Sequence, residues 1–123
     1  MVILIVDDHA EMRRTIRSVV ADLARVVYEC AGGAEALAAC RAHRPDWVLM
    51  DIRMEGMDGL AATCAIASAC PEVRVCIVTS YDDVRLREEA ARAGAHAYVL
   101  KDRLLSLRPI LLGEPGAAVD LQR

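Results

Sequence analysis

The chain of 123 residues is 55% apolar and 27% charged, and it carries a net charge of −3. This length suits a single domain, and the apolar content excludes a disordered chain. The negative charge argues against direct binding of nucleic acid, which needs clustered positive charge to meet the phosphates.

Apolar runs of strand length alternate with segments of helical periodicity along the chain. The first run, Val2–Val6, is apolar on both faces and mostly β-branched, as expected for a strand that is covered on both sides. Residues 10–25 follow with apolar side chains at three- and four-residue spacing, which predicts an amphipathic helix. Residues 25–30 form a second predicted strand, and Gly33 opens an alanine-rich helix that reaches about His43.

The same alternation continues through the middle of the chain. Pro45 ends the alanine-rich helix, and residues 47–51 form a third predicted strand. Asp58 is the expected N-cap of a helix that ends at Pro71. Residues 73–78 are again apolar and β-branched, which predicts a fourth strand.

One further unit follows. Ser80 and Asp82 are candidate N-caps for a helix that continues to about Ala93 and is closed by Gly94. Residues 95–100 form the fifth predicted strand.

The C-terminal end is less regular. Leucines and an isoleucine between residues 104 and 112 predict a last helix, with Pro109 in its first turn or at a kink. Gly113, Pro115 and Gly116 then end regular structure, and the last ten residues look like a tail. We expect a single domain over residues 1–123, with an irregular end from about residue 109.

Five strand–helix units with short connections predict a parallel sheet with helices on both faces, because such crossovers are right-handed. At this length, the expected fold is a flavodoxin-like α/β sandwich of three layers. Its five-stranded sheet would have the strand order 2-1-3-4-5.

Polar or charged side chains follow four of the five predicted strands. They are Asp7 and Asp8 after the first, Asp51 at the end of the third, Thr79 after the fourth and Lys101 after the fifth. In open α/β sheets the ligand site lies beyond the carboxyl ends of the strands. We therefore expect these side chains to share one site.

The residue types at this edge indicate phosphoryl chemistry. Three carboxylates repel one another unless a cation lies among them, and hard oxygen ligands suit Mg²⁺, which often shares its shell with a phosphate. Lys101, the single lysine beside fourteen arginines, would supply a compact positive charge, and Thr79 would supply a hydroxyl donor. Such a site would neutralise a phosphoryl group and hold a carboxylate ready to attack it.

Each of these residues has an ordinary explanation when it is taken alone. An aspartate at a strand end is usually a turn former or a helix cap, a threonine there is a turn residue, and a lysine is a solvated charge. Their joint occurrence beyond four different strands favours the functional interpretation. The three histidines, His9, His43 and His96, lack the spacing of metal ligands.

The chain resembles the response-regulator receiver family of two-component signalling over roughly residues 2–101. The segments that carry the resemblance are IVDDH at 5–9, LMDIRMEGMDG at 49–59, VTSYDD at 78–83 and AGAHAYVLKD at 93–102. The DIRM and AYVLKD segments are most similar to the subfamily whose members usually carry a LuxR-type helix-turn-helix output domain.

The resemblance implies a metal-dependent phosphoacceptor. Asp51 would be the phosphorylated residue and a metal ligand. Asp8 would bind Mg²⁺ directly, and Asp7 would help to position it through a water molecule. The backbone carbonyl of Arg53 would complete the protein's share of the metal shell.

The resemblance also implies a switch. Thr79 and Lys101 would contact the phosphoryl oxygens, and Tyr98 would be the switch aromatic that turns inward when Thr79 is drawn toward the phosphoryl group. Arg53 and Tyr81 would flank the site, which makes them candidates for setting the lifetime of the phosphorylated state.

The implied reaction is in-line transfer from the phosphohistidine of a sensor histidine kinase to Asp51, which gives an acyl phosphate. The chain would be a signalling switch that catalyses only its own phosphorylation and slow dephosphorylation. The fourth helix, fifth strand and fifth helix would report the state to a partner, and a homodimer is one assembly that this allows. DNA would be reached only through an output domain that is absent from these residues.

Two features depart from the family pattern. Glu55 stands where the family commonly has a proline, and its charge near the acidic edge would slow the entry of an anionic donor. Pro109 interrupts the last helix, so the partner face would differ from that of the family, or the chain would be a fragment of a longer regulator.

Cysteine usage and the N-terminus bear on location. The five cysteines are an odd number and none forms a CxxC pair, which predicts free thiols in a reducing cytoplasm. The N-terminal segment has neither the basic region nor the cleavage site of a signal peptide, and no apolar run approaches the roughly 20 residues of a membrane span.

Three other functions remain open. A phosphatase-like enzyme with an aspartate nucleophile would carry a DxD pattern after its first strand, where this chain has DDH. A flavodoxin-type electron carrier would need a Ser/Thr/Gly-rich phosphate loop there. A degenerate receiver, used only for protein binding, would have no reason to keep the complete acidic and basic set.

Overall fold

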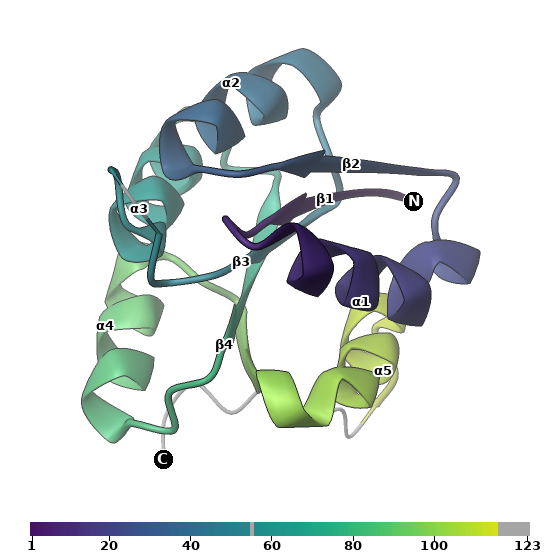
Figure 1. Ribbon diagram of the computed structural model, residues 1–123. Helices are drawn as coiled ribbons and strands as arrows, with labels where there is room; N and C mark the ends of the chain where they lie inside the picture. The colour runs from purple at the N-terminus through teal and green to yellow at the C-terminus, as the bar shows by residue number, and fades with distance from the viewer. Residues whose placement is uncertain (55, 116–123) are drawn as a thin grey trace.

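A computed structural model describes residues 1–54 and 56–115 of the chain. Five parallel strands form one sheet in the order β2-β1-β3-β4-β5 (Figure 1). The strands are β1 (Val2–Val6), β2 (Val26–Cys30), β3 (Trp47–Met50), β4 (Arg74–Thr79) and β5 (Ala97–Leu100). This topology confirms the predicted flavodoxin-like fold.

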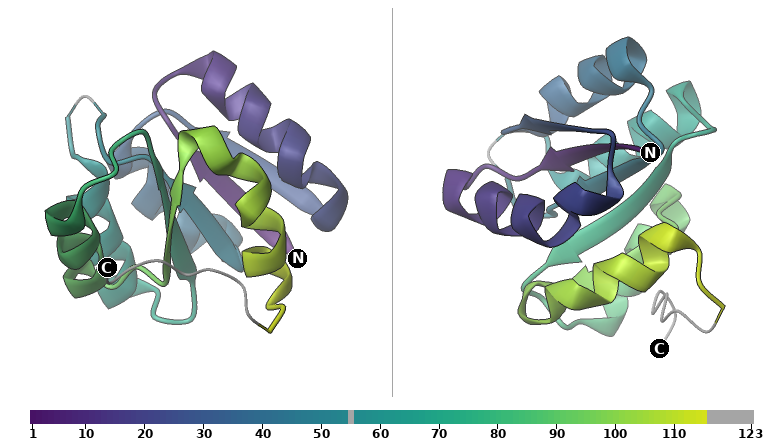
Figure 2. Two further views of the ribbon diagram at one scale, coloured as in Figure 1. Left: turned by 90° about the horizontal axis from the view of Figure 1, so that it is seen from below. Right: turned by 90° about the vertical axis from the view of Figure 1, so that its right-hand side faces the viewer.

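Helices cover both faces of the sheet and give three layers (Figure 2). They are α1 (Ala10–Val20), α2 (Gly33–His43), α3 (Gly59–Ala69), α4 (Val84–Ala93) and α5 (Leu107–Leu112), with the short 3₁₀ helices η1 (Ala21–Leu23) and η2 (Lys101–Ser106). One apolar cluster packs α1 and α5 on one face, and a second packs α2, α3 and α4 on the other. The central strands are apolar on both sides because each side faces a helix layer.

The boundaries differ from the predictions at several places. Helix α1 ends at Val20 and a 3₁₀ turn completes the segment that was predicted to be helical to residue 25. The fourth strand extends to Thr79, which is its last residue. The prediction that Ser80 or Asp82 caps the fourth helix is wrong, because Asp83 Oδ1 accepts hydrogen bonds from the amides of Arg85 and Leu86 in the first turn of α4.

The end of the chain shows how Pro109 is accommodated. It lies in the first turn of α5, where a proline sacrifices no helical hydrogen bond. Gly113 closes this helix in the left-handed conformation, with a φ of 67°. Residues 116–123 of the predicted tail lie outside the described residues. Glu55, which was expected to affect the entry of the donor, also lies outside them.

In the part of the chain that the structure describes, none of the helices has the length and apolar content to cross a bilayer.

Candidate functional site

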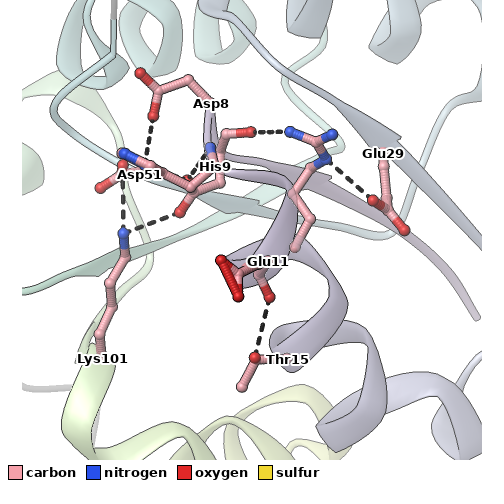
Figure 3. Close-up of polar contacts among 9 residues, drawn as sticks. Asp8, His9, Glu11, Thr15, Glu29, Asp51 and Lys101 are labelled. Atoms are coloured by element: carbon pink, nitrogen blue, oxygen red, sulfur yellow. Dashed lines mark hydrogen bonds and ion pairs between the residues drawn. The ribbon is translucent and has the colours of Figure 1, made fainter.

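At the carboxyl ends of three strands, Lys101 contacts both Asp7 and Asp51. Figure 3 shows Lys101 pointing toward Asp51. Lys101 Nζ lies 2.9 Å from Asp7 Oδ2 and 3.4 Å from Asp51 Oδ2. Both carboxylates are buried, and the lysine side chain is 14% exposed. The positive charge therefore stands between two carboxylates that are otherwise shielded from water.

Sheet register sets this geometry. Val6 of β1 pairs with Met50 of β3, so the next residues, Asp7 and Asp51, emerge side by side. The amide of Asp51 donates to the Val6 carbonyl at 3.0 Å, which continues the ladder by one residue. The two carboxylates are thus positioned by regular strand pairing.

Asp8 and His9 form the outer part of the acidic cluster. His9 Nδ1 lies 2.9 Å from Asp8 Oδ1 and 3.4 Å from Asp7 Oδ1, and the His9 amide donates to Asp7 Oδ1 at 2.8 Å. The Asp8 side chain is 26% exposed, whereas that of His9 is 73% exposed. The cluster opens to solvent on this side.

The donor atoms of this cluster fit a divalent cation. One ligand atom from each of Asp7, Asp8 and His9 can be chosen so that the three lie within 4.8 Å of one another. Asp7 Oδ2 and Asp8 Oδ1 are buried yet accept no well-directed hydrogen bond, although Lys101 Nζ and His9 Nδ1 each lie 2.9 Å from one of them. Unsatisfied carboxylate oxygens at a partly open edge are the ligands that Mg²⁺ prefers.

The electrostatics favour holding a positive charge here. Burial raises the pKa of Asp51; Lys101 opposes this rise and Asp7 reinforces it. Burial alone would lower the pKa of Lys101, but the Asp7 and Asp51 carboxylates outweigh it, and the pKa is raised. Lys101 therefore remains an ammonium at neutral pH, and the site can still accept a cation.

Thr79 and the aromatic residues lie beside this acidic edge. The Thr79 side chain is buried, and its hydroxyl oxygen accepts a hydrogen bond from the Tyr81 amide at 3.4 Å. The Tyr98 ring is buried, and its hydroxyl donates to the Tyr81 carbonyl at 2.7 Å. The guanidinium of Arg53 lies over the exposed Tyr81 ring, 4.7 Å from its centroid.

An open pocket adjoins Lys101. Its volume is about 280 Å³, and it is lined by Ser80, Asp82, Leu100, Lys101 and Asp102. Lys101 therefore borders open space, together with Asp82 and Asp102.

The predictions missed two residues that shape the site. His9 was set aside for lack of metal-ligand spacing, yet it contacts both neighbouring aspartates. Arg13 of α1 donates to the Asp7 carbonyl at 2.6 Å and to Glu29 Oε1 at 3.0 Å, which ties the first loop to β2. The four-residue spacing of Arg13 and Arg17 on one helix face could have pointed to a shared acidic partner.

Gly59 holds the loop after Asp51 close to the start of α3. Its amide donates to the Ile52 carbonyl at 2.8 Å, and a Cβ at this position would lie 1.8 Å from the Asp51 carbonyl oxygen. The position therefore requires glycine because of close approach.

Comparisons with known proteins agree on one family. The response regulator receiver domain matches residues 3–107. The oxygen regulatory protein NreC of Staphylococcus haemolyticus is 36% identical over 122 residues, covering 93% of this chain and 56% of the relative. The response regulator protein VraR of Staphylococcus aureus is 39% identical over 101 residues, covering 80% of this chain and 48% of the relative.

Solved structures show the same similarity. The signal receiver domain of the putative response regulator NarL from Mycobacterium tuberculosis has a TM-score of 0.81 at 28% identity, over 92% of this chain and 96% of that one. A LuxR-family response regulator from Aurantimonas has a TM-score of 0.80 at 29% identity, over 91% and 85%. The chain spans about half the length of the curated relatives it matches.

Proposed function

The chain belongs to the response regulator receiver domain family, of the LuxR type, and from this we propose that Asp51 accepts a phosphoryl group from a sensor histidine kinase. The observation that carries the proposal is the contact of Lys101 with both Asp7 and Asp51. A lysine that is held between a buried nucleophile and a buried acid supplies charge where the oxygens of an incoming phosphoryl group would lie.

The proposed cofactor is Mg²⁺. The carboxylates of Asp7, Asp8 and Asp51 would hold it, together with the backbone carbonyl of Arg53, which lies two residues beyond Asp51. When bound, the ion supplies positive charge to the phosphoryl oxygens. The unsatisfied oxygens of Asp7 and Asp8 support this assignment.

The residues of the chain would perform the transfer by position and charge. A carboxylate oxygen of Asp51 attacks phosphorus in line as the phosphorus–nitrogen bond of the donor phosphohistidine breaks, and the electron pair returns to the imidazole. Lys101 stabilises charge on the phosphoryl oxygens, and Thr79 donates its hydroxyl hydrogen to one of them. Hydrolysis of the acyl phosphate then regenerates the Asp51 carboxylate.

The phosphoryl group would change the output surface through Thr79 and Tyr98. Both are joined to Tyr81, one at its amide and the other at its carbonyl, so a movement of Thr79 is transmitted to the ring. The surface formed by α4, β5 and α5 would report this state to a partner or a second copy of the chain. DNA would be contacted through an output domain outside these residues, and the cytoplasmic location stays a prediction.

Arg53 and Tyr81 are proposed to set the lifetime of the phosphorylated state. Arg53 follows Ile52, and Tyr81 lies two residues after Thr79. The cation–π contact between their side chains lies on the solvent side. Removing the Arg53 guanidinium or the Tyr81 ring would give water easier access to the acyl phosphate. Both variants should therefore lose the phosphoryl group faster.

Phosphorylation by a small donor tests the proposal. The protein is incubated with acetyl phosphate and Mg²⁺, and its intact mass is recorded with time. We expect one phosphoryl addition that requires Mg²⁺, is removed by hydroxylamine and is absent from Asp51→Ala. The exposed neighbour of the lysine, Asp102, gives the matched control, because Asp102→Asn should be labelled like the wild type.

The remaining functions predict different results. A degenerate receiver would take up no phosphoryl group under any condition, and a phosphatase-like enzyme would hydrolyse phosphate esters over many turnovers. Labelling that persists in Asp51→Ala would contradict the assignment of the acceptor.

A further inference from the structure

Helix α4 buries an arginine. Five of its ten residues are charged, and its two buried positions are Ala90 and Arg87, of which Arg87 is 5% exposed. A buried guanidinium is costly unless charged and aromatic groups surround it. Arg87 thus has a role that its exposed neighbours on the helix do not share.

The contacts of Arg87 join α4 to the preceding loop and to β5. Its Nη1 donates to Asp82 Oδ1 at 2.5 Å, and its guanidinium carbon lies 4.7 Å from the centroid of the Tyr98 ring. Asp82 is the residue that was wrongly predicted to cap the helix. Its carboxylate instead anchors the arginine that faces the tyrosine.

Tyr98 is held at two points. Its hydroxyl donates to the Tyr81 carbonyl, and Arg87 covers its ring, which is 2% exposed. Neither contact involves Asp51 or Lys101, so neither needs a phosphoryl group on Asp51 in order to form. Turning the ring outward would break the hydrogen bond from the Tyr98 hydroxyl to the Tyr81 carbonyl. It would also remove the aromatic face from the buried guanidinium of Arg87.

We propose that Arg87 is a positioning residue that holds Tyr98 in its inward position before phosphorylation. The inference rests on the proposed function, in which Tyr98 is the switch aromatic, and adds the regulation of that switch. Because Arg87 stabilises the inward ring, a larger share of the unphosphorylated chain is already in the state that phosphorylation selects. Phosphorylation completes this shift through Thr79, and the resting level of output is higher with Arg87 than without it.

The exposure of Tyr98 to solvent tests the inference directly. The chain has three tyrosines, Tyr28, Tyr81 and Tyr98, so 3-fluorotyrosine labelling gives three fluorine resonances that single Tyr→Phe variants assign. A soluble paramagnetic agent broadens resonances of exposed rings. In the wild type we expect the Tyr98 resonance to be largely protected without Mg²⁺ or phosphoryl donor, and to be protected further with beryllofluoride and Mg²⁺.

Arg87→Met keeps the length of the side chain and removes the cation. We expect the Tyr98 equilibrium to shift about tenfold toward the outward position, with increased broadening that beryllofluoride reverses. Arg87→Lys, which restores a cation, should recover part of the protection. Asp82→Asn, at an exposed carboxylate, should shift Tyr98 in the same direction without removing a buried group. Arg85→Met is the matched control and should leave Tyr98 unchanged.

The pKa of Tyr98 distinguishes a ring that has turned outward from a ring that stays inward in a less tightly packed core. Burial raises the pKa of Tyr98 to about 12, while Arg87 acts to lower it. A ring that stays inward in Arg87→Met would show a pKa above the wild-type value, and a ring that turns outward would titrate nearer 10.0, its ordinary value. The inference predicts the lower pKa.

Two outcomes would overturn it: a Tyr98 resonance that is exposed in the resting wild type, or equal protection in Arg87→Met, Asp82→Asn and wild type. These measurements need no phosphorylation, so a failure of Asp51 to accept a phosphoryl group would leave their result intact.

Discussion

Lys101 Nζ lies 3.4 Å from Asp51 Oδ2 although β4 separates the strands that carry the two residues. The lysine follows β5 and reaches across the end of β4 to the end of β3, where it also meets Asp7 from β1. The Lys101 ammonium thus contacts carboxylates that follow two different strands. It crosses the end of β4, whose last residue is Thr79. This arrangement places the charge of Lys101 beside the proposed nucleophile.

Replacement of Lys101 should slow the phosphorylation of Asp51. Lys101→Met removes the charge that stabilises the phosphoryl oxygens, and we expect the rate of phosphoryl uptake from acetyl phosphate to fall about 10²-fold. The rate is followed by intact mass at saturating Mg²⁺.

Lys101→Arg is the matched variant, because it keeps the charge but replaces a compact ammonium by a planar group. It should also be slow, with a smaller loss. A wild-type rate in Lys101→Met would show that the lysine has no part in the transfer.

Asp51→Asn should stabilise the metal-free protein at neutral pH. Burial raises the pKa of Asp51, so the folded state binds this proton more tightly than the unfolded state. The resulting stabilisation is present below the unfolded pKa and is lost as pH rises through the folded pKa. Asparagine cannot ionise and avoids this loss.

Urea unfolding at neutral pH and in mild acid measures the difference. The advantage of Asp51→Asn should be larger at neutral pH, and Mg²⁺ should stabilise the wild type more than the variant. An advantage that grows in acid would contradict the raised pKa.

Gly59→Ala should destabilise the loop that supports Asp51. The new Cβ would lie 1.8 Å from the Asp51 carbonyl oxygen, so the backbone must move, at a cost of about 3 kcal/mol in unfolding free energy. Gly32→Ala is the control, because the nearest atom to its Cβ is 3.4 Å away, and it should cost less than about 1 kcal/mol. Equal costs in urea unfolding would show that the close approach at Gly59 is relieved without strain.

Much of this site could be predicted because strand ends are visible in the sequence. Asp7, Asp51 and Lys101 each follow an apolar run, and parallel pairing brings such positions to one edge. The partners of Arg87 could not be predicted, since the arginine looks like any exposed residue of a polar helix. Its burial depends on how α4 packs on β5 and on the turn that places Asp82 beside it.

The boundary errors have a similar origin. Two neighbouring aspartates, Asp82 and Asp83, are equivalent in sequence, and only the backbone conformation decides that Asp83 caps α4. The contact of His9 with Asp8 could not be predicted from the spacing of the three histidines, because it depends on the turn after β1.

The cysteines should differ sharply in reactivity. Cys64 is exposed on α3, whereas burial raises the pKa of Cys40 to about 12 and that of Cys30 to about 11. Thiolates are the reactive form, so iodoacetamide should modify the native protein once, at Cys64. Peptide mapping with Cys64→Ser as control checks this, and rapid modification of Cys40 would indicate that the native packing of α2 opens readily.

Mapping the acyl phosphate identifies the residue that accepts the phosphoryl group. After phosphorylation with acetyl phosphate and Mg²⁺, borohydride reduces an aspartyl phosphate to homoserine and releases phosphate. Peptide sequencing by mass spectrometry then locates the reduced residue. We expect homoserine at position 51 alone, in a reaction that depends on Mg²⁺. Homoserine at Asp7, Asp8 or any other aspartate, or none under conditions in which the protein is folded and Mg²⁺ is present, would contradict it.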